Sequence, residues 1–266
     1  MKSPLSIGCQ TITYGDPQHD RFSEIFSELA EDGYGGVEIG YRRLKNVPAA
    51  EAAALLSRNG LELLGSHVGG NLEDAGQAQA ERSMIDEVLD YLEEVETPRL
   101  MYSGLHFESA DQFRRDIDMI FRSAERCRSR GIRLLYHNHD WEFADGWKVY
   151  SQLLAEAPES LHFCVDVGWV EKAGVDALKV LERVGDRLEV VHFKDFATTG
   201  NREMDTVILG TGVIDLPKIS QWLIGRGKAA WIVAEQDVAE GSASDATRAN
   251  ATYLRSIVGG SEVALG

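Results

Sequence analysis

The sequence predicts a (β/α)8 barrel, an α/β fold in which parallel strands alternate with helices. Eight short apolar runs, most of them rich in β-branched residues, alternate with amphipathic helical patterns. The length of 266 residues suits such a barrel, which typically needs about 250. The first apolar run is not followed by the glycine-rich phosphate loop of open doubly wound sheets, the main competing fold. Because no linker or low-complexity stretch divides the chain, we expect one domain over residues 1–266.

The apolar runs are short enough to be parallel strands that are buried on both faces. A strand followed by a helix, repeated along the chain, is the arrangement that closes into a barrel. The predicted strands are Leu5–Thr11, Gly36–Gly40, Leu61–His67, Arg99–Ser103, Ile132–Asn138, Leu161–Asp166, Arg187–Phe193 and Ala230–Glu235.

Apolar residues recur at helical spacing between these strands. In the first crossover, Phe22, Ile25 and Leu29 fall on one face of a helix that Gly33 is placed to end. Pro48 suits the first turn of the next helix, where its missing N–H would have no partner in any case. Further helices are predicted over Ala75–Glu96, Asp111–Arg130 and Ser244–Val258.

The chain is strongly acidic, with 27 Lys and Arg against 43 Asp and Glu and a net charge of −16. This balance argues against nucleic-acid and anionic-membrane partners, which require a basic surface. No apolar run is long enough to span a membrane, and no signal-peptide pattern opens the chain. Cys9, Cys127 and Cys164 show no CxxC spacing, as is typical of a reducing compartment. We therefore expect a cytoplasmic protein.

Polar residues stand where several predicted strands end. Asp166, His192 and Glu235 each come at the end of an apolar run or shortly before it. The C-terminal ends of barrel strands converge on one face, which carries the chemistry in such folds. A carboxylate directly after a buried strand is costly unless it is paired or binds a metal. We therefore expect one divalent metal ion at this face.

The fifth strand ends in the segment YHNHDWEF, which offers several candidates for a fourth ligand. We expect Glu142 to be this ligand, because a site of Glu, Asp, His and Glu has a familiar balance of charge. Strand alternation puts His137 and His139 on one side of the strand, and either is the alternative ligand.

Other polar residues fall at the same predicted face and are candidates for binding a substrate. His67 ends the third strand and His106 follows the fourth. Glu38, on the second strand, either orients a substrate hydroxyl or pairs with a lysine or arginine of the barrel. Lys194 either holds a substrate oxygen or phosphate, or reaches solvent. The segment Gly210-Thr211-Gly212 is either a phosphate loop or a turn.

Six segments in barrel order, GVEIG, GSHVG, HNHDWEF, VDVGW, VHFKD and AEQD, resemble the sugar phosphate isomerase/epimerase family of xylose-isomerase-like TIM barrels. The resemblance covers nearly the whole chain. It implies one divalent ion held by Glu142, Asp166, His192 and Glu235. Many members carry the first Glu at the end of the fifth strand itself, where this chain has His137 or Asn138.

This resemblance implies an isomerase or epimerase that acts on a keto sugar by proton transfer through an enediolate. Glu142 and Glu235 would share the proton transfer, and His67, His106, His137, Lys194 and Glu38 would bind the substrate. The donor set suits Mn²⁺, Mg²⁺, Co²⁺ or Zn²⁺.

Two other functions stay open at this stage. One is a metal-dependent lyase or dehydratase that acts on a keto sugar, keto-glycoside or inosose. The other is a sugar-binding barrel without catalytic activity. Trp141, Trp147 and Trp169 would wall the pocket or contact a neighbouring subunit of a homo-oligomer.

Overall fold

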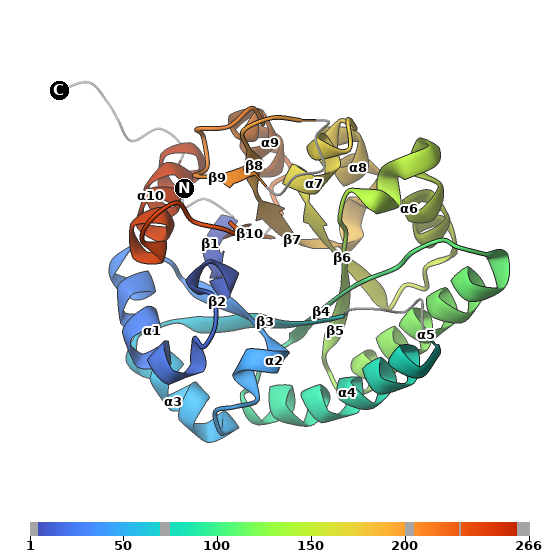
Figure 1. The fold of residues 1–266 in the computed structure, drawn as a ribbon, viewed down its shortest axis with the longest axis horizontal. Helices are drawn as coiled ribbons and strands as arrows, with labels where there is room; N and C mark the ends of the chain where they lie inside the picture. Colours follow the sequence, from blue (N-terminus) through green and yellow to red (C-terminus); the bar gives the residue numbers. More distant parts are fainter. Residues whose placement is uncertain (1–4, 70–74, 200–204, 229, 260–266) are drawn as a thin grey trace.

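A computed structural model describes residues 5–69, 75–199, 205–228 and 230–259. Within them, eight parallel strands close into a barrel in the order β1-β10-β7-β6-β5-β4-β3-β2. Helices surround the strands on all sides (Figure 1). The barrel predicted from the sequence is therefore confirmed. The barrel strands are β1 (Leu5–Gln10), β2 (Gly36–Gly40), β3 (Glu62–Gly69), β4 (Arg99–Ser103), β5 (Arg133–His137), β6 (Leu161–Asp166), β7 (Leu188–Phe193) and β10 (Ala230–Ala234).

The observed helices include those predicted and several short ones in the loops between strand and helix. The long helix predicted over Asp111–Arg130 is α5, for which Ser109 accepts a hydrogen bond from the N–H of Gln112 as N-cap. The helices are α1 (Phe22–Glu31), α2 (Tyr41–Leu44), α3 (Ala49–Arg58), α4 (Ala75–Glu94), α5 (Ala110–Ser129), α6 (Ala144–Glu156), α7 (Val167–Lys172), α8 (Ala177–Val184), α9 (Leu216–Gly225) and α10 (Ala243–Val258). No described helix is both long and apolar enough to cross a membrane.

A small hairpin that the sequence analysis did not predict follows β7. It pairs β8 (Asp195–Phe196) with β9 (Thr206–Val207) in antiparallel fashion. The carboxylate of Asp195 accepts hydrogen bonds from the N–H groups of Phe196, Gly210, Gly212 and Ile214. Because two of these N–H groups belong to the Gly210-Thr211-Gly212 segment, that segment is a turn anchored on Asp195.

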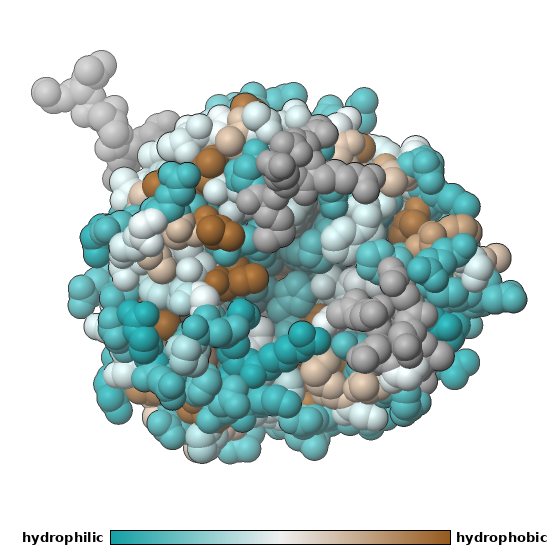
Figure 2. Space-filling model, viewed as in Figure 1, coloured by the Kyte–Doolittle hydropathy of each residue, from teal (hydrophilic) through white to brown (hydrophobic). Residues whose placement is uncertain are grey.

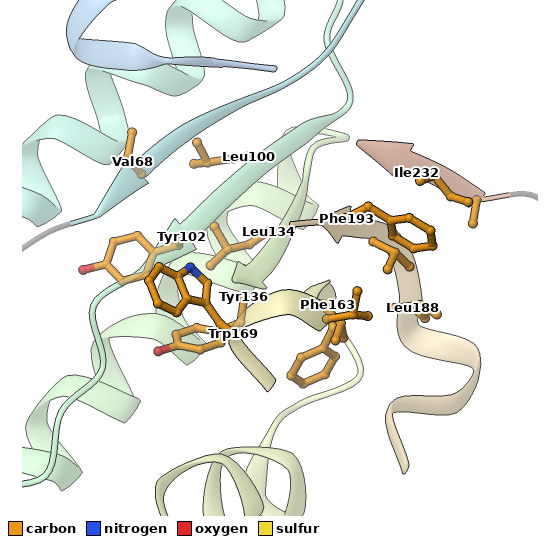
Figure 3. Packing of buried hydrophobic residues seen from close by; sticks show 14 of the residues in the cluster. Val68, Leu100, Tyr102, Leu134, Tyr136, Phe163, Trp169, Leu188, Phe193 and Ile232 are labelled. Carbon is orange, nitrogen blue, oxygen red and sulfur yellow. The ribbon is translucent and has the colours of Figure 1, made fainter. Parts of the chain in front are cut away.

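The main hydrophobic core lies between the strands and the helices. Outward-facing strand residues such as Tyr102, Tyr136 and Phe163 are fully buried there (Figure 3). Burial of each such side chain stabilises the fold by roughly 1.5–3 kcal/mol. On the outside, hydrophilic side chains cover most of the surface seen in Figure 2, as the acidic composition implies.

The interior of the barrel is filled by layers of side chains. A charged layer near the N-terminal ends of the strands joins Glu189 to Arg99, Arg133 and His162. Above it lies an apolar layer of Leu64, Met101, Leu135, Cys164, Val190 and Val233. The next side chains along the strands are polar, and they form the candidate site.

Candidate metal centre

Polar side chains follow the apolar layer on four neighbouring strands with the same offset of two residues. Since successive strand residues alternate between interior and exterior, an offset of two keeps the side chain inside the barrel. The pairs are Leu135 and His137 on β5, Cys164 and Asp166 on β6, Val190 and His192 on β7, and Val233 and Glu235 at the end of β10. The parallel register then sets these polar residues side by side, as with Asp166 opposite His192.

His137, Asp166, His192 and Glu235 form a buried cluster in which one ligand atom from each lies within 4.8 Å of all the others. Nε2 of His137 lies 3.1 Å from Nδ1 of His192. The same Nε2 is 3.7 Å from Oδ2 of Asp166 and 3.8 Å from Oε2 of Glu235. Nδ1 of His192 also contacts Oε2 of Glu235. Two imidazoles and two carboxylates therefore converge on one point.

Asp166 provides a test of whether a cation fits this point. Its Oδ1 atom accepts a hydrogen bond of 2.9 Å from the N–H of Trp169 and so caps α7. Its Oδ2 atom is buried and has no hydrogen-bond partner among the described residues. The side-chain amide of Asn138 holds the backbone of Asp166 through two hydrogen bonds of 3.1 Å. A buried carboxylate oxygen with no partner, held rigidly toward three other donors, fits a divalent ion.

The structure does not bring Glu142 into this cluster, although the sequence analysis expected it as a ligand. Glu142 lies in a 3-10 turn (Trp141–Phe143) and is fully buried. Its Oε1 accepts a hydrogen bond of 2.7 Å from the hydroxyl of Tyr136, and its Oε2 accepts one of 2.8 Å from the N–H of His139. Burial raises the pKa of Glu142 to about 7, against the opposing effect of these hydrogen bonds. His137, one of the two alternatives, stands in its place.

Lys194 is buried beside the cluster rather than reaching solvent. Its Nζ lies 2.8 Å from Oδ2 of Asp237, 3.2 Å from Oε1 of Glu235 and 3.6 Å from Oδ2 of Asp166. It also lies 4.7 Å from the centre of the Trp169 ring. Burial alone would lower the pKa of Lys194, but the three carboxylates outweigh it and raise that pKa. The side chain is thus a fixed cation at the edge of the cluster.

Glu38 is completely buried and contacts two histidines, whereas the sequence analysis expected a substrate hydroxyl, or a lysine or arginine, as its partner. Its Oε2 lies 2.7 Å from Nε2 of His192, and its Oε1 lies 3.5 Å from Nδ1 of His67. Burial works to raise the pKa of Glu38, but His192 and then His67 hold it at about 2. Nε2 of His67 is 2.9 Å from Oγ of Ser103. Ser103 was not singled out by the sequence, because small polar residues at strand ends are common.

Aromatic rings form one wall of the site. The ring of Trp141 stacks between those of His139 and His106, at centroid distances of 4.1 and 4.8 Å. The ring of His139 lies 5.0 Å from that of His137, which joins this wall to the cluster. Trp147 packs on Phe143, away from this wall.

An open pocket of about 170 Å³ is lined by none of the four cluster residues and comes near them at His67, whose ring lies 5.1 Å from that of His137. It is lined by Gln10, Tyr41, Arg43 and His67, among others. The side chain of His67 keeps 18% of its surface exposed, whereas His192 and Glu38 are completely buried. His67 is therefore the ionisable residue of this group that a small molecule in the pocket would meet.

Comparison with known proteins identifies the family of this barrel. A family model described as a xylose isomerase-like TIM barrel matches residues 26–257. The chain belongs to this family. The resemblance inferred from the six sequence segments is thereby confirmed.

Curated relatives cover most of the chain. It is 26% identical to inosose dehydratase of Geobacillus kaustophilus over 278 aligned positions, which cover 89% of each protein. It is 22% identical to inosose dehydratase of Clostridium beijerinckii, over 84% of this chain and 85% of that protein.

Solved structures share the fold. A sugar phosphate isomerase/epimerase from Parabacteroides distasonis superposes with a TM-score of 0.79 at 19% identity, covering 96% of this chain and 94% of that one. The IolI protein, solved with a zinc atom, superposes with a TM-score of 0.77 at 14% identity, over 95% of this chain and 98% of that one. Both structures show that the whole barrel is shared.

Proposed function

We propose that this protein is a divalent-metal-dependent dehydratase that removes water from a cyclic keto polyol of the inosose type. The inosose dehydratases that match most of the chain support this function. The sequence alone favoured an isomerase or epimerase and kept the dehydratase as the alternative; the curated relatives support the alternative better. The fold of the sugar phosphate isomerase/epimerase keeps epimerisation as the second candidate.

The cluster of His137, Asp166, His192 and Glu235 would hold the metal. Two imidazole nitrogens and two carboxylate oxygens suit Zn²⁺, Mn²⁺ or Co²⁺ better than Mg²⁺, which prefers an all-oxygen site. A bound ion would supply Lewis-acid polarisation of the substrate ketone. Lys194, fixed beside Asp166 and Glu235, would donate a hydrogen bond to the oxygen on which negative charge develops.

The partly exposed imidazole of His67 is the observation that supports a dehydratase. Dehydration requires a base for the proton on the carbon next to the ketone, and an acid for the hydroxide that leaves the following carbon. His67 lines the pocket, and its ring lies 5.1 Å from that of His137. It can take the carbon-bound proton and return it to the leaving hydroxide, so that one water molecule is released without a net change in protons.

Epimerisation makes a different demand on the site. It requires proton-transfer groups on both faces of the substrate, a role for which Glu142 and Glu235 were the expected pair. Both oxygens of Glu142 are engaged by Tyr136 and His139. The carboxylate oxygens of Glu235 contact His192 and Lys194. Although burial works in the opposite direction, the positive charge of Lys194 lowers the pKa of Glu235. A single accessible base is better suited to elimination.

Product analysis by mass spectrometry tests the proposal. The metal-loaded protein is incubated with an inosose, a keto-glycoside, a keto sugar and a keto sugar phosphate, with Asp166→Asn as the inactive control. We expect the inosose to give a product lighter by one water molecule. In D₂O, a product that has lost no water but carries one deuterium from the solvent would show that the protein is an epimerase or isomerase instead.

A further inference from the structure

Glu38 lies close to the metal cluster but is shielded from any substrate. It sits on β2, which is separated from β7 by β1 and β10 in the barrel order, and its side chain reaches across the interior to His192. Its exposed fraction is 0%. A completely buried carboxylate cannot bind a substrate hydroxyl, so its effect on the site must pass through the side chains that it contacts.

Those contacts are two imidazoles, one on each oxygen. Oε2 of Glu38 lies 2.7 Å from Nε2 of His192, and Oε1 lies 3.5 Å from Nδ1 of His67. For His192, the contact involves the ring nitrogen that faces away from the cluster. Nδ1 of His192 faces the cluster, and Nε2 of His67 lies 2.9 Å from Oγ of Ser103.

An ionised carboxylate only accepts hydrogen bonds, so it determines where a neutral ring that it bonds carries its proton. Nε2 of His192 must then hold the proton, which leaves the lone pair of Nδ1 directed at the cluster. Histidines that bind metals commonly have their second nitrogen fixed in this way. The 3.5 Å between Oε1 of Glu38 and Nδ1 of His67 is too long for a hydrogen bond, so Glu38 acts on that ring through its negative charge.

The other side of His192 offers no competing metal site of comparable quality. Near Nε2, the additional donor groups are Glu38 and the thiol of Cys164. Cys164 belongs to the apolar layer of the barrel interior. Besides His192 itself, three donors on the Nδ1 side outweigh one carboxylate and a thiol packed among aliphatic side chains.

We propose that Glu38 is a positioning residue that sets the tautomer of the metal ligand His192 through the hydrogen bond to its Nε2. Its other oxygen places a negative charge 3.5 Å from the ring of His67. This inference rests on the metal centre of the proposed function, but it holds whether the reaction is dehydration or epimerisation.

The test compares zinc affinity among the wild type, Glu38→Gln and Glu38→Leu by competition with a chelator. Glutamine keeps an acceptor oxygen for His192 but lacks the charge, whereas leucine removes the acceptor. We expect zinc affinity to fall by about 10-fold in the first variant and by up to about 100-fold in the second, the range for loss of an outer partner of a ligand.

Glu189→Gln is the matched control. Glu189 also bonds a histidine, with Oε1 lying 2.9 Å from Nδ1 of His162, but at the opposite end of the barrel interior. We expect its zinc affinity to equal that of the wild type. Thermal unfolding of every variant shows whether it is folded. If Glu38→Leu does not fold, Glu38→Gln keeps the test valid, because glutamine has the same shape as glutamate.

Nitrogen NMR of the zinc-loaded protein supplies a readout that a merely structural role would not change. We expect the Nε2-protonated form of His192 in the wild type and in Glu38→Gln, and loss of that fixed form in Glu38→Leu. Wild-type zinc affinity in both Glu38 variants would overturn the role of Glu38 while the metal centre stands. Absence of zinc binding by the wild type would instead overturn the metal centre and this inference with it.

Discussion

His137 and His192 face each other across the barrel interior, with Nε2 of the first 3.1 Å from Nδ1 of the second. They come from β5 and β7, and β6 between them contributes Asp166. The two nitrogen atoms are also close to two carboxylates. This arrangement suits the coordination of one metal cation better than a hydrogen bond between the two rings. The pair therefore defines the nitrogen side of the proposed metal centre.

The first prediction distinguishes His137 from Glu142 as the fourth ligand. We expect His137→Ala to lose most of its bound zinc, with a loss of affinity above the roughly 10–100-fold that removal of an outer partner causes. Glu142→Gln should bind zinc like the wild type, because its carboxylate is engaged by Tyr136 and His139. Elemental analysis and chelator competition measure both. Zinc loss in Glu142→Gln together with retention in His137→Ala would reverse the assignment.

The second prediction concerns the pH dependence of stability caused by Glu142. Burial raises the pKa of Glu142 from 4.5 to about 7, so the folded protein retains a proton that the unfolded chain has released. Protonated Glu142 therefore contributes to the stability of the fold fully below pH 4.5, and this contribution is lost as the pH rises from about 4.5 to about 7. Between these two pH values, the free energy of unfolding falls by about 3 kcal/mol because of Glu142.

Glu142→Gln isolates this effect, because glutamine mimics the protonated acid at every pH. We expect the variant to gain stability relative to the wild type between pH 5 and pH 8, by up to about 3 kcal/mol. Urea unfolding at the two pH values measures the difference. An equal difference between variant and wild type at both values would show that Glu142 is ionised throughout.

The fold could be predicted almost completely from the sequence, because it depends on local patterns that repeat. Short apolar runs locate the strands along the chain, and amphipathic patterns locate the helices between them. Strands such as Gly36–Gly40 and Arg99–Ser103 have the same bounds in the structure as in the prediction. The β8–β9 hairpin was missed because two-residue strands carry no periodic pattern. Its anchor, Asp195, is recognisable only when distant N–H groups are brought to it.

The candidate site could be predicted in part. Asp166, His192 and Glu235 come together, as expected for residues at strand ends. The fourth residue of the cluster follows from a different pattern, which is that each cluster residue comes two positions after a side chain of the interior apolar layer. That offset selects His137, since Leu135 precedes it in the interior. Composition and motif favoured Glu142 instead. The link from Glu38 to His192 spans the barrel, and no local pattern could reveal it.

The third prediction concerns the charge of Lys194. Lys194→Met leaves Glu235, Asp237 and Asp166 without the buried cation that they surround. Loss of one partner from a buried ion pair typically costs about 3–5 kcal/mol. We expect the metal-free variant to unfold at a clearly lower temperature, and added zinc to restore much of the loss, because it replaces the missing positive charge.

Lys172→Met provides the comparison for Lys194→Met. Lys172 is also buried, but it pairs with Asp205 and the carbonyl oxygen of Thr198, away from the cluster. Zinc should stabilise this variant only as much as it stabilises the wild type. An equal gain from zinc in both lysine variants would argue against Lys194 as the neighbouring charge of the metal centre.

The last prediction concerns the loop anchored on Asp195. A methyl group at Gly212 would overlap the carboxylate of Asp195 and the carbonyl oxygen of Phe196. Gly212→Ala must therefore push this loop away and weaken the hydrogen bonds that its N–H groups donate. We expect a loss of roughly 1–3 kcal/mol in the free energy of unfolding, as for other overpacked sites.

Gly225→Ala is the matched substitution for this test. Gly225 ends α9, and a methyl group there meets no atom of the described residues within 4 Å. This change should be neutral or stabilise the protein by up to about 1 kcal/mol, because alanine favours the helix. Denaturant unfolding compares the two variants. If Gly212→Ala proved as stable as Gly225→Ala, the close packing of the loop on Asp195 would be wrong, and its N–H groups would again be available to a phosphate.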